Sequence, residues 1–144
     1  MTKDTLDLSY AAGLFDGEGT VGLVRCHRNC YRSPMVSVPS CTPHLLSWLW
    51  TRFGGSISTK RCYKKGHSPS GVWALGSDAS LKFLDLIFPY MREPEKIRRA
   101  RMLIEEYKSV TPRNGKYTPA TLERKRIFEK AFFRNTRKKL SIRL

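Results

Sequence analysis

Two carboxylates in this chain stand where an apolar helical run gives way to a strand. Residues 11–19 read Ala-Ala-Gly-Leu-Phe-Asp-Gly-Glu-Gly, with Asp16 and Glu18 near the end. A carboxylate at a helix C-terminus faces the negative end of the helix dipole, which destabilises it. This placement favours a metal-binding role for the acidic residues. The alternative is a glycine-terminated helix whose two carboxylates are only solvated.

The glycines of the same segment indicate a close helix contact. Each glycine costs a helix about 1 kcal/mol relative to alanine, so tertiary packing must offset that cost. Gly13 and Gly17 are four residues apart, share one helix face and let another backbone approach. Asp7 is expected to cap the helix that carries them.

The composition predicts a polyanionic partner. The chain of 144 residues has 27 Lys plus Arg against 12 Asp plus Glu, a formal charge of +15 and a pI near 10.1. Such an excess indicates nucleic-acid binding, although charge that only maintains solubility is the alternative. No apolar run reaches membrane-spanning length and no secretory signal opens the sequence. We therefore expect an intracellular protein that is not secreted and binds no membrane.

Four cysteines fit a reducing compartment with free thiols. Their positions are 26, 30, 41 and 62, with His27 beside the first. A zinc site is the alternative, but the spacing lacks the paired CxxC knuckle that zinc sites use.

The periodicity of apolar residues predicts an α+β fold in which helices and strand pairs alternate. Strands are expected at 20–26, 35–38, 56–61 and 72–75, and helices at 8–15, 44–53, 78–88, 95–108 and 120–135. Val36, Val38, Ile57, Trp73 and Leu75 are expected to face the core, as are Trp48 and Trp50. Asp78 is expected to cap its helix, and Pro89 to end it.

Strand pairs joined as hairpins predict an antiparallel sheet with helices on one face and the other face bare. A bare two-stranded ribbon of this kind fits the DNA major groove. An ordinary solvated surface is the alternative. The side chains expected to contact DNA are Val24, Cys26, Arg28, Tyr31, Arg32, Ser37, Ser58, Lys60, Arg61, Lys64 and Lys65.

Residues 11–19 resemble the signature motif of the LAGLIDADG homing endonucleases at all nine positions. The departures are conservative: Ala11 replaces the leading Leu, Phe15 an Ile, Gly17 an Ala and Glu18 the second Asp. The αββαββα order of this family matches residues 5–109. The resemblance thus implies one endonuclease domain over 1–109, followed by a linker, a basic C-terminal helix and a tail over 110–144.

The resemblance also implies the catalytic residues. Glu18 would bind a divalent metal together with Gly17, and Lys96 would stabilise charge on the phosphorus, because Lys96-x-x-Arg99-Ala100 is similar to the family's Lys-x-x-Gln-Ala. Ser40 stands where the family has a polar residue that positions water, and His44 is a weaker candidate for an outer contact. The expected cofactor is Mg2+, with Mn2+ or Ca2+ able to replace it for binding.

One copy of the motif implies a homodimer, because members with a single motif pair their motif helices. The expected dimer interface is Ala12, Gly13, Asp16 and Gly17. A two-fold dimer would cut a long pseudo-palindromic duplex site on both strands and leave staggered ends, as in intron homing. The partners are then double-stranded DNA and a second copy, with no small-molecule substrate.

Two other functions remain open at this point. A relative that binds without cleaving, either an RNA maturase for intron splicing or a DNA-binding regulator, would share the same scaffold. A basic RNA-binding or ribosome-associated domain would explain the charge but not residues 11–19. The basic tail is either a clamp on DNA phosphates or a solvated segment.

Overall fold

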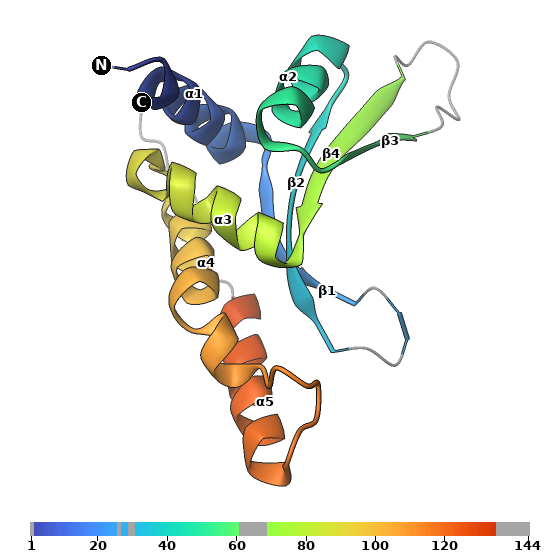
Figure 1. Ribbon diagram of the computed structural model, residues 1–144, viewed down its shortest axis with the longest axis vertical. Helices are drawn as coiled ribbons and strands as arrows, with labels where there is room; N and C mark the ends of the chain where they lie inside the picture. The colour runs from blue at the N-terminus through green and yellow to red at the C-terminus, as the bar shows by residue number, and fades with distance from the viewer. Residues whose placement is uncertain (1, 26, 29–30, 61–68, 135–144) are drawn as a thin grey trace, which may run out of the picture.

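The computed structural model describes residues 2–25, 27–28, 31–60 and 69–134. Its elements along the chain (Figure 1) are α1 (Lys3–Glu18), β1 (Thr20–Val24), β2 (Ser33–Ser40), α2 (Pro43–Phe53), β3 (Ser56–Lys60), β4 (Ser70–Gly76), α3 (Ser77–Ile87), η1 (Phe88–Tyr90), α4 (Pro94–Glu105), η2 (Tyr107–Val110) and α5 (Pro119–Phe133). The predicted αββαββα order with a further C-terminal helix is confirmed.

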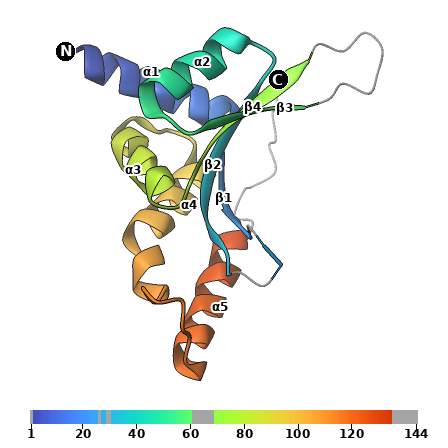
Figure 2. The same cartoon turned by 45° about the vertical axis from the view of Figure 1, so that its right-hand side comes forward.

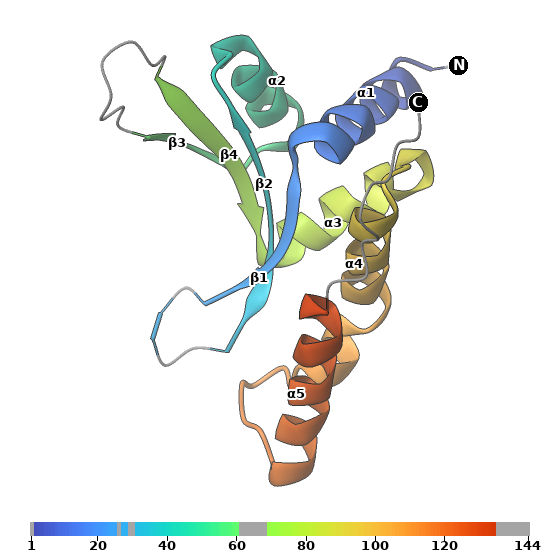
Figure 3. The same ribbon diagram turned by 180° about the vertical axis from the view of Figure 1, so that it is seen from behind.

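The strands of the described residues form a four-stranded antiparallel sheet in the order β1-β2-β4-β3. The two inner strands, β2 and β4, therefore come from different hairpins. Helices α1 to α4 lie on one side of this sheet (Figure 2), and the view from behind shows its strands uncovered (Figure 3). The predicted bare face is thus present.

Alternate side chains of the sheet build the core. Val36, Val38 and Trp73 are at most 1% exposed, as the alternation of the strands predicts. The ring of Phe83 from α3 stands edge-on to Trp73 at 5.2 Å and to Phe15 of α1 at 5.6 Å. Burial of side chains this large is worth about 2–3 kcal/mol each. The aromatic cluster thus holds α1 and α3 to the sheet.

Several sequence expectations about individual residues are wrong. Trp50 is 54% exposed, because it lies about 100° around α2 from the buried Leu49. Ile57 faces the helix side beside Trp73, as predicted, but it is 41% exposed because β3 is an edge strand. The ends of elements also differ: α3 begins before Asp78, Pro89 lies inside η1, and α4 ends at Glu105.

Helix α1 begins earlier than expected. The Thr2 hydroxyl accepts a hydrogen bond from the Thr5 N–H at 3.2 Å and acts as the N-cap. Asp7 lies inside the helix, with its carboxylate 3.4 Å from the guanidinium of Arg52 in α2. The local rule does not distinguish Thr2 from Asp7, because each has a side-chain oxygen that can accept from a free N–H group of a first helical turn. The tie to Arg52 gives Asp7 a different role.

Helix α5 joins the same core as the rest of the chain. Phe128 and Phe132 are 6% and 0% exposed and belong to the hydrophobic cluster that also contains Phe15 and Trp73. The division of the chain at residue 109 stays a prediction. The packing shows, however, that α5 contributes side chains to the same core as the helices before it.

Lys125 of α5 is buried beside the turn that precedes its helix. The ammonium donates a hydrogen bond to the Thr111 hydroxyl at 2.6 Å and lies 4.2 Å from the centre of the Tyr107 ring. Burial lowers the pKa of Lys125 to about 8, and the nearby Glu129 carboxylate opposes this shift. Both the hydroxyl and the ring face stabilise the charged form only in part.

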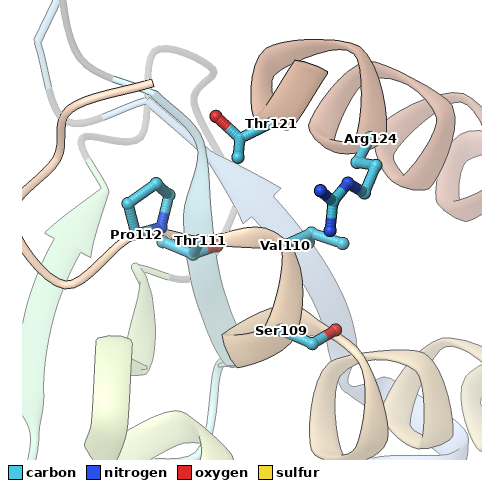
Figure 4. A pocket seen from close by; sticks show the side chains of 6 residues that line it. All are labelled: Ser109, Val110, Thr111, Pro112, Thr121 and Arg124. Atoms are coloured by element: carbon cyan, nitrogen blue, oxygen red, sulfur yellow. The ribbon is translucent and has the colours of Figure 1, made fainter. Parts of the chain in front are cut away.

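A cavity of about 170 Å³ lies next to this lysine (Figure 4). Side chains of the turn after α4 face the first turns of α5 across it. Its lining residues are Ser109, Val110, Thr111, Pro112, Thr121 and Arg124. This set contains no carboxylate, thiol or imidazole, so the cavity offers neither a metal site nor an acid–base pair.

The lowered pKa predicts a stability that rises with pH. Between pH 8 and 10.5 the unfolded chain keeps a proton on Lys125 that the folded chain has lost, so folding is favoured as the pH increases. Urea unfolding measures the free energy of unfolding of the natural chain and of Lys125→Met at each pH. From pH 7.5 to 9.5 this free energy should rise by on the order of 2 kcal/mol more in the natural chain than in the variant. Lys130→Met, at an exposed position of α5, controls for the lost charge. An equal pH response in both variants would contradict this account of the burial.

Candidate functional site

The motif segment ends α1 in a way that presents Glu18 at the last helical position. The Gly19 N–H donates to the Phe15 carbonyl at 2.8 Å and closes the helix. A Cβ on Gly19 would overlap the buried ring of Phe15. Only glycine therefore lets the chain pass from α1 directly into β1. Glu18 is left exposed between the two elements.

The C-terminus of α1 meets the N-terminus of α4, and each end is capped by the other helix. The Asp16 carboxylate accepts hydrogen bonds from the backbone N–H groups of Arg92 at 2.8 Å and Glu93 at 3.3 Å. In return, the Lys96 ammonium donates to the carbonyls of Phe15 at 3.1 Å and Asp16 at 2.6 Å. An acidic group at a helix N-terminus and a basic group at a C-terminus are the favourable combinations with the two dipoles.

The junction between α1 and α4 brings Lys96 next to the last turn of α1, which carries Glu18. Lys96 bonds to the carbonyls of the two residues that lie just before Gly17 and Glu18. Asp16, expected at a dimer interface, is engaged within its own chain. The Glu93 side chain also caps α4 by accepting from the Lys96 N–H at 2.7 Å. These contacts fix the last turn of α1, and with it Glu18, relative to the sheet.

Glu18 and Ser40 line one cleft of about 510 Å³. The other residues around it are Leu14, Pro39, Cys41, Thr42, Leu45 and Ser70. Ser40 ends β2, and its hydroxyl accepts from the Thr42 N–H at 3.0 Å where the chain turns into α2. Two of the predicted catalytic residues thus come together from distant elements.

Ser70 is a hydroxyl in this cleft that the sequence did not single out. It opens β4, and the pairing of Ser40 with Gly71 brings the ends of the two strands together. Only the strand order reveals this neighbourhood, because β2 and β4 belong to different hairpins. A serine before a strand is otherwise an ordinary turn residue.

The donor set of the cleft fits a hard divalent cation in part. It offers the Glu18 carboxylate and the hydroxyls of Ser40, Thr42 and Ser70, and oxygen ligands of this kind suit Mg2+ and Ca2+. Among the described residues, no group of three His, Cys, Asp or Glu side chains lies close enough to hold a metal. A cation at Glu18 would therefore need further oxygens from outside the chain.

The residues expected at a dimer interface divide into two groups. Ala12 is fully buried in the chain's own core, so this expectation is wrong for that residue. Gly13 and Gly17 are exposed, and a Cβ added to either would meet nothing within 4 Å. Leu6 and Tyr10, 54% and 50% exposed, continue the same open face of α1.

The bare face of the sheet carries several of the residues expected to contact DNA. Ser37 pairs with Thr20 and Ala74, and Ser58 pairs with Val72, which places both on the face away from the buried Trp73. Val24 shares this face, Lys60 ends β3, and Arg28 is exposed beyond β1. Cys26, Arg61, Lys64 and Lys65 lie outside the described residues. Small side chains dominate this face in the described strands, so a ligand can come close to the backbone.

Tyr31 and Arg32, also expected to contact DNA, lie between β1 and β2 and contact other parts of the chain. The Arg32 guanidinium lies 4.9 Å from the centre of the Phe133 ring of α5 and donates to the Leu23 carbonyl at 3.2 Å. The Tyr31 ring lies 4.1 Å from the ring of Tyr117. Both side chains contact the C-terminal segment.

Sequence reasoning also missed a buried acidic residue in α4. Glu95 is 6% exposed, and its carboxylate lies 2.6 Å from Arg98 and 3.4 Å from Arg99. Arg99 also donates to the Val21 carbonyl at 3.3 Å, which ties α4 to β1. The Glu-x-x-Arg spacing was visible in the sequence, but it is common on solvated helices and does not indicate burial.

The cysteines give no zinc site that can be described. Cys41 is exposed and has no disulfide partner among the described residues. Cys26, Cys30 and Cys62 lie outside them. His44, in the first turn of α2, is exposed and does not line the cleft with Glu18.

Comparison with solved structures shows that this fold is that of homing endonucleases. The archaeal intron-encoded homing endonuclease I-Vdi141I, solved with DNA, matches with a TM-score of 0.71 and 17% identity over 96% of this chain and 89% of that chain. I-CvuI, solved with its target in the presence of Ca, matches with a TM-score of 0.68 and 19% identity over 96% and 88% of the two chains. The resemblance to LAGLIDADG homing endonucleases is thus confirmed at the level of the fold.

Two features of these matches bear on the chain's organisation. A mutant of I-SmaMI matches with a TM-score of 0.62 and 21% identity, over 93% of this chain but only 46% of that one. Coverage of 96% in the other matches extends the similarity beyond residue 109, where the sequence resemblance stopped.

The sequence matches no protein-family model and no curated protein. Within the described residues, none of the helices has the length and apolar character needed to cross a bilayer.

The junction between α1 and α4 predicts a specific cost for Asp16→Ala. Removing this acceptor leaves two backbone N–H groups unsatisfied, so the free energy of unfolding should fall by about 1–3 kcal/mol. Asp16→Asn keeps one acceptor oxygen and should lose less. Urea denaturation measures both, with Asp85→Ala as the control, because Asp85 is an exposed carboxylate of α3. Equal losses for Asp16→Ala and Asp85→Ala would show that the junction adds nothing to stability.

Proposed function

We propose that this chain is a site-specific DNA endonuclease that hydrolyses both strands of a duplex as a homodimer with a divalent metal. The observation that carries the proposal is the cleft in which Glu18 and Ser40 meet. This cleft lies between the end of α1 and the turn from β2 into α2, at one end of the bare sheet. A duplex lying along the sheet would therefore bring its phosphates to these side chains.

The charge and the shape of the molecule support DNA as the substrate. A net charge of +15 favours binding to a phosphate backbone. The bare strands carry small and hydroxyl side chains such as Ser37 and Ser58, which allow close approach to base edges. I-Vdi141I and I-CvuI, which have this fold, were solved with DNA.

The residues around the cleft support metal-dependent hydrolysis. Glu18 would hold the divalent cation, with the carbonyl of Gly17 beside it. When bound, such a cation activates a water and stabilises charge on the phosphate. Ser40 and Ser70 line the same cleft and offer hydroxyls that can hold a water by hydrogen bonds.

Lys96 supports this chemistry through the position of its ammonium. Its bonds to the Phe15 and Asp16 carbonyls offset the negative end of α1, which would otherwise repel a phosphate. The same bonds hold the last turn of the helix in place. We therefore assign Lys96 a positioning role, together with a positive potential at the end of α1 that would stabilise charge on the phosphate.

A homodimer is supported by the open face of α1. The exposed Gly13 and Gly17 leave room for a second helix to approach at backbone distance, and Leu6 and Tyr10 add apolar surface. Because the chain aligns with about half of I-SmaMI, two copies would supply a protein of similar size. A two-fold axis at the glycines would bring two Glu18 residues close together.

Cleavage of a randomised duplex library in Mg2+ tests the proposed function. Sequencing of the cut ends should give a pseudo-palindromic site with staggered ends. Glu18→Gln should lose cleavage by at least a thousandfold, because a neutral amide binds the cation poorly, and should retain DNA binding. Glu123→Gln makes the same chemical change at an exposed position of α5 outside the cleft and serves as the control.

Other outcomes distinguish the alternatives. Binding to duplex DNA without cleavage by the natural chain would point to a regulator on this scaffold. Preference for a structured RNA over duplex DNA would point to a maturase. Cleavage that survives Glu18→Gln unchanged would remove Glu18 from the site.

A further inference from the structure

We propose that α5 is a brace that sets the direction of the β1–β2 hairpin, and that Arg32 and Phe133 are the positioning residues that connect them. The proposal rests on the proposed function, in which the bare sheet face binds DNA. It assigns part of the sequence specificity to a helix on the other side of the hairpin.

The outer end of the hairpin needs support from outside the sheet. The pairing of β2 with β4 begins at Met35, so the pairs Leu23–Pro34 and Val24–Ser33 lie beyond the third strand. A two-stranded ribbon is only marginally stable in water, and its twist varies more than that of a wider sheet. The direction of this end is therefore not fixed by strand pairing alone.

Arg32 connects this outer end to α5. Its guanidinium donates to the Leu23 carbonyl at 3.2 Å, within the ribbon, and lies over the Phe133 ring at 4.9 Å. The Glu129 carboxylate of α5 lies 3.9 Å from the same side chain. The Tyr31–Tyr117 ring contact at 4.1 Å adds a second attachment, to the loop before α5.

Helix α5 is itself anchored to α4, so it can serve as a fixed support. Arg98 donates to the carbonyls of Ala131, Phe132 and Arg134 at 2.8–3.0 Å, which satisfies the C-terminal end of α5. The buried Glu95 carboxylate holds Arg98 from the other side at 2.6 Å. Phe132 is fully buried, with Arg99 over its ring at 5.0 Å. The C-terminal end of α5, next to Phe133, is thus the best-held part of the helix.

This arrangement separates specificity from chemistry. Strand β1 runs from Thr20, next to the end of α1, to Val24 (Figure 3). Arg32 joins its Leu23 carbonyl to Phe133 of α5. Loss of the brace would change the direction of the outer ribbon and leave the cleft at the other end of β1 unchanged. Base pairs far from the cleavage point would be read less accurately, while the cut itself would persist.

A double-mutant cycle tests the brace in two ways. Arg32→Ala, Phe133→Ala and the double variant are compared by hydrogen exchange of the β1 and β2 amides and by the cleavage profile on the randomised library. Each single variant should speed hydrogen exchange of the outer β1 and β2 amides about tenfold, because it removes one charged hydrogen bond or ring contact. The double variant should do little more than either single one, because both remove the same attachment.

Matched variants separate the brace from a direct DNA contact. Arg28→Ala removes an exposed arginine from the same hairpin and should leave exchange at the β1 and β2 amides unchanged. Tyr117→Ala tests the second attachment and gives a further variant if Phe133→Ala lowers stability. In the library profile, Arg32→Ala and Phe133→Ala should relax the same outer positions of the site.

The proposal is overturned if Arg32→Ala weakens DNA binding without faster exchange, since Arg32 would then be a DNA contact. Additive effects of the two substitutions on exchange would also overturn it. Should the natural chain bind no DNA, the proposed function fails, and hydrogen exchange still decides whether α5 holds the hairpin.

Discussion

The meeting of two helix ends is the interaction on which the rest of this structure depends. The C-terminus of α1 and the N-terminus of α4 face each other, and each helix supplies the charged side chain that the other end requires. Asp16 satisfies the N–H groups of Arg92 and Glu93, and Lys96 satisfies the carbonyls of Phe15 and Asp16. Two of these hydrogen bonds go to the Asp16 carboxylate and two come from the Lys96 ammonium. Movement of either helix end would therefore break hydrogen bonds at both ends. Glu18 owes its fixed place in the cleft to this junction.

Helix α4 also connects this junction to β1 and to α5. From one side of the helix, Arg99 reaches the backbone of β1, and Arg98 reaches the end of α5. The buried Glu95 carboxylate keeps both guanidinium groups in position. These guanidinium groups are thus engaged inside the molecule, at backbone carbonyls and aromatic rings. They contribute to the net positive charge, but their donors are used within the chain.

The sequence allowed the fold to be predicted where local rules decide. Alternation placed Val36, Val38 and Trp73 on the covered face, and the motif placed Glu18 at the end of a helix. Local rules fail where the partner is distant in sequence. The acceptor role of Asp16 depends on backbone groups 76 and 77 residues later, and the role of Arg32 on a ring near the C-terminus. The prediction that Trp50 lies in the core failed for a related reason. An apolar side chain does not show by itself which face of its helix is covered by the neighbouring elements.

The most direct test of the account is a crystal structure of the chain on its cleaved or uncleaved duplex with Mn2+, located by anomalous scattering. A metal peak is expected against the Glu18 carboxylate, within the cleft that contains Ser40, with the Lys96 ammonium still on the carbonyls of α1. A peak at another carboxylate, or DNA bound on a surface other than the bare face of the sheet, would contradict it.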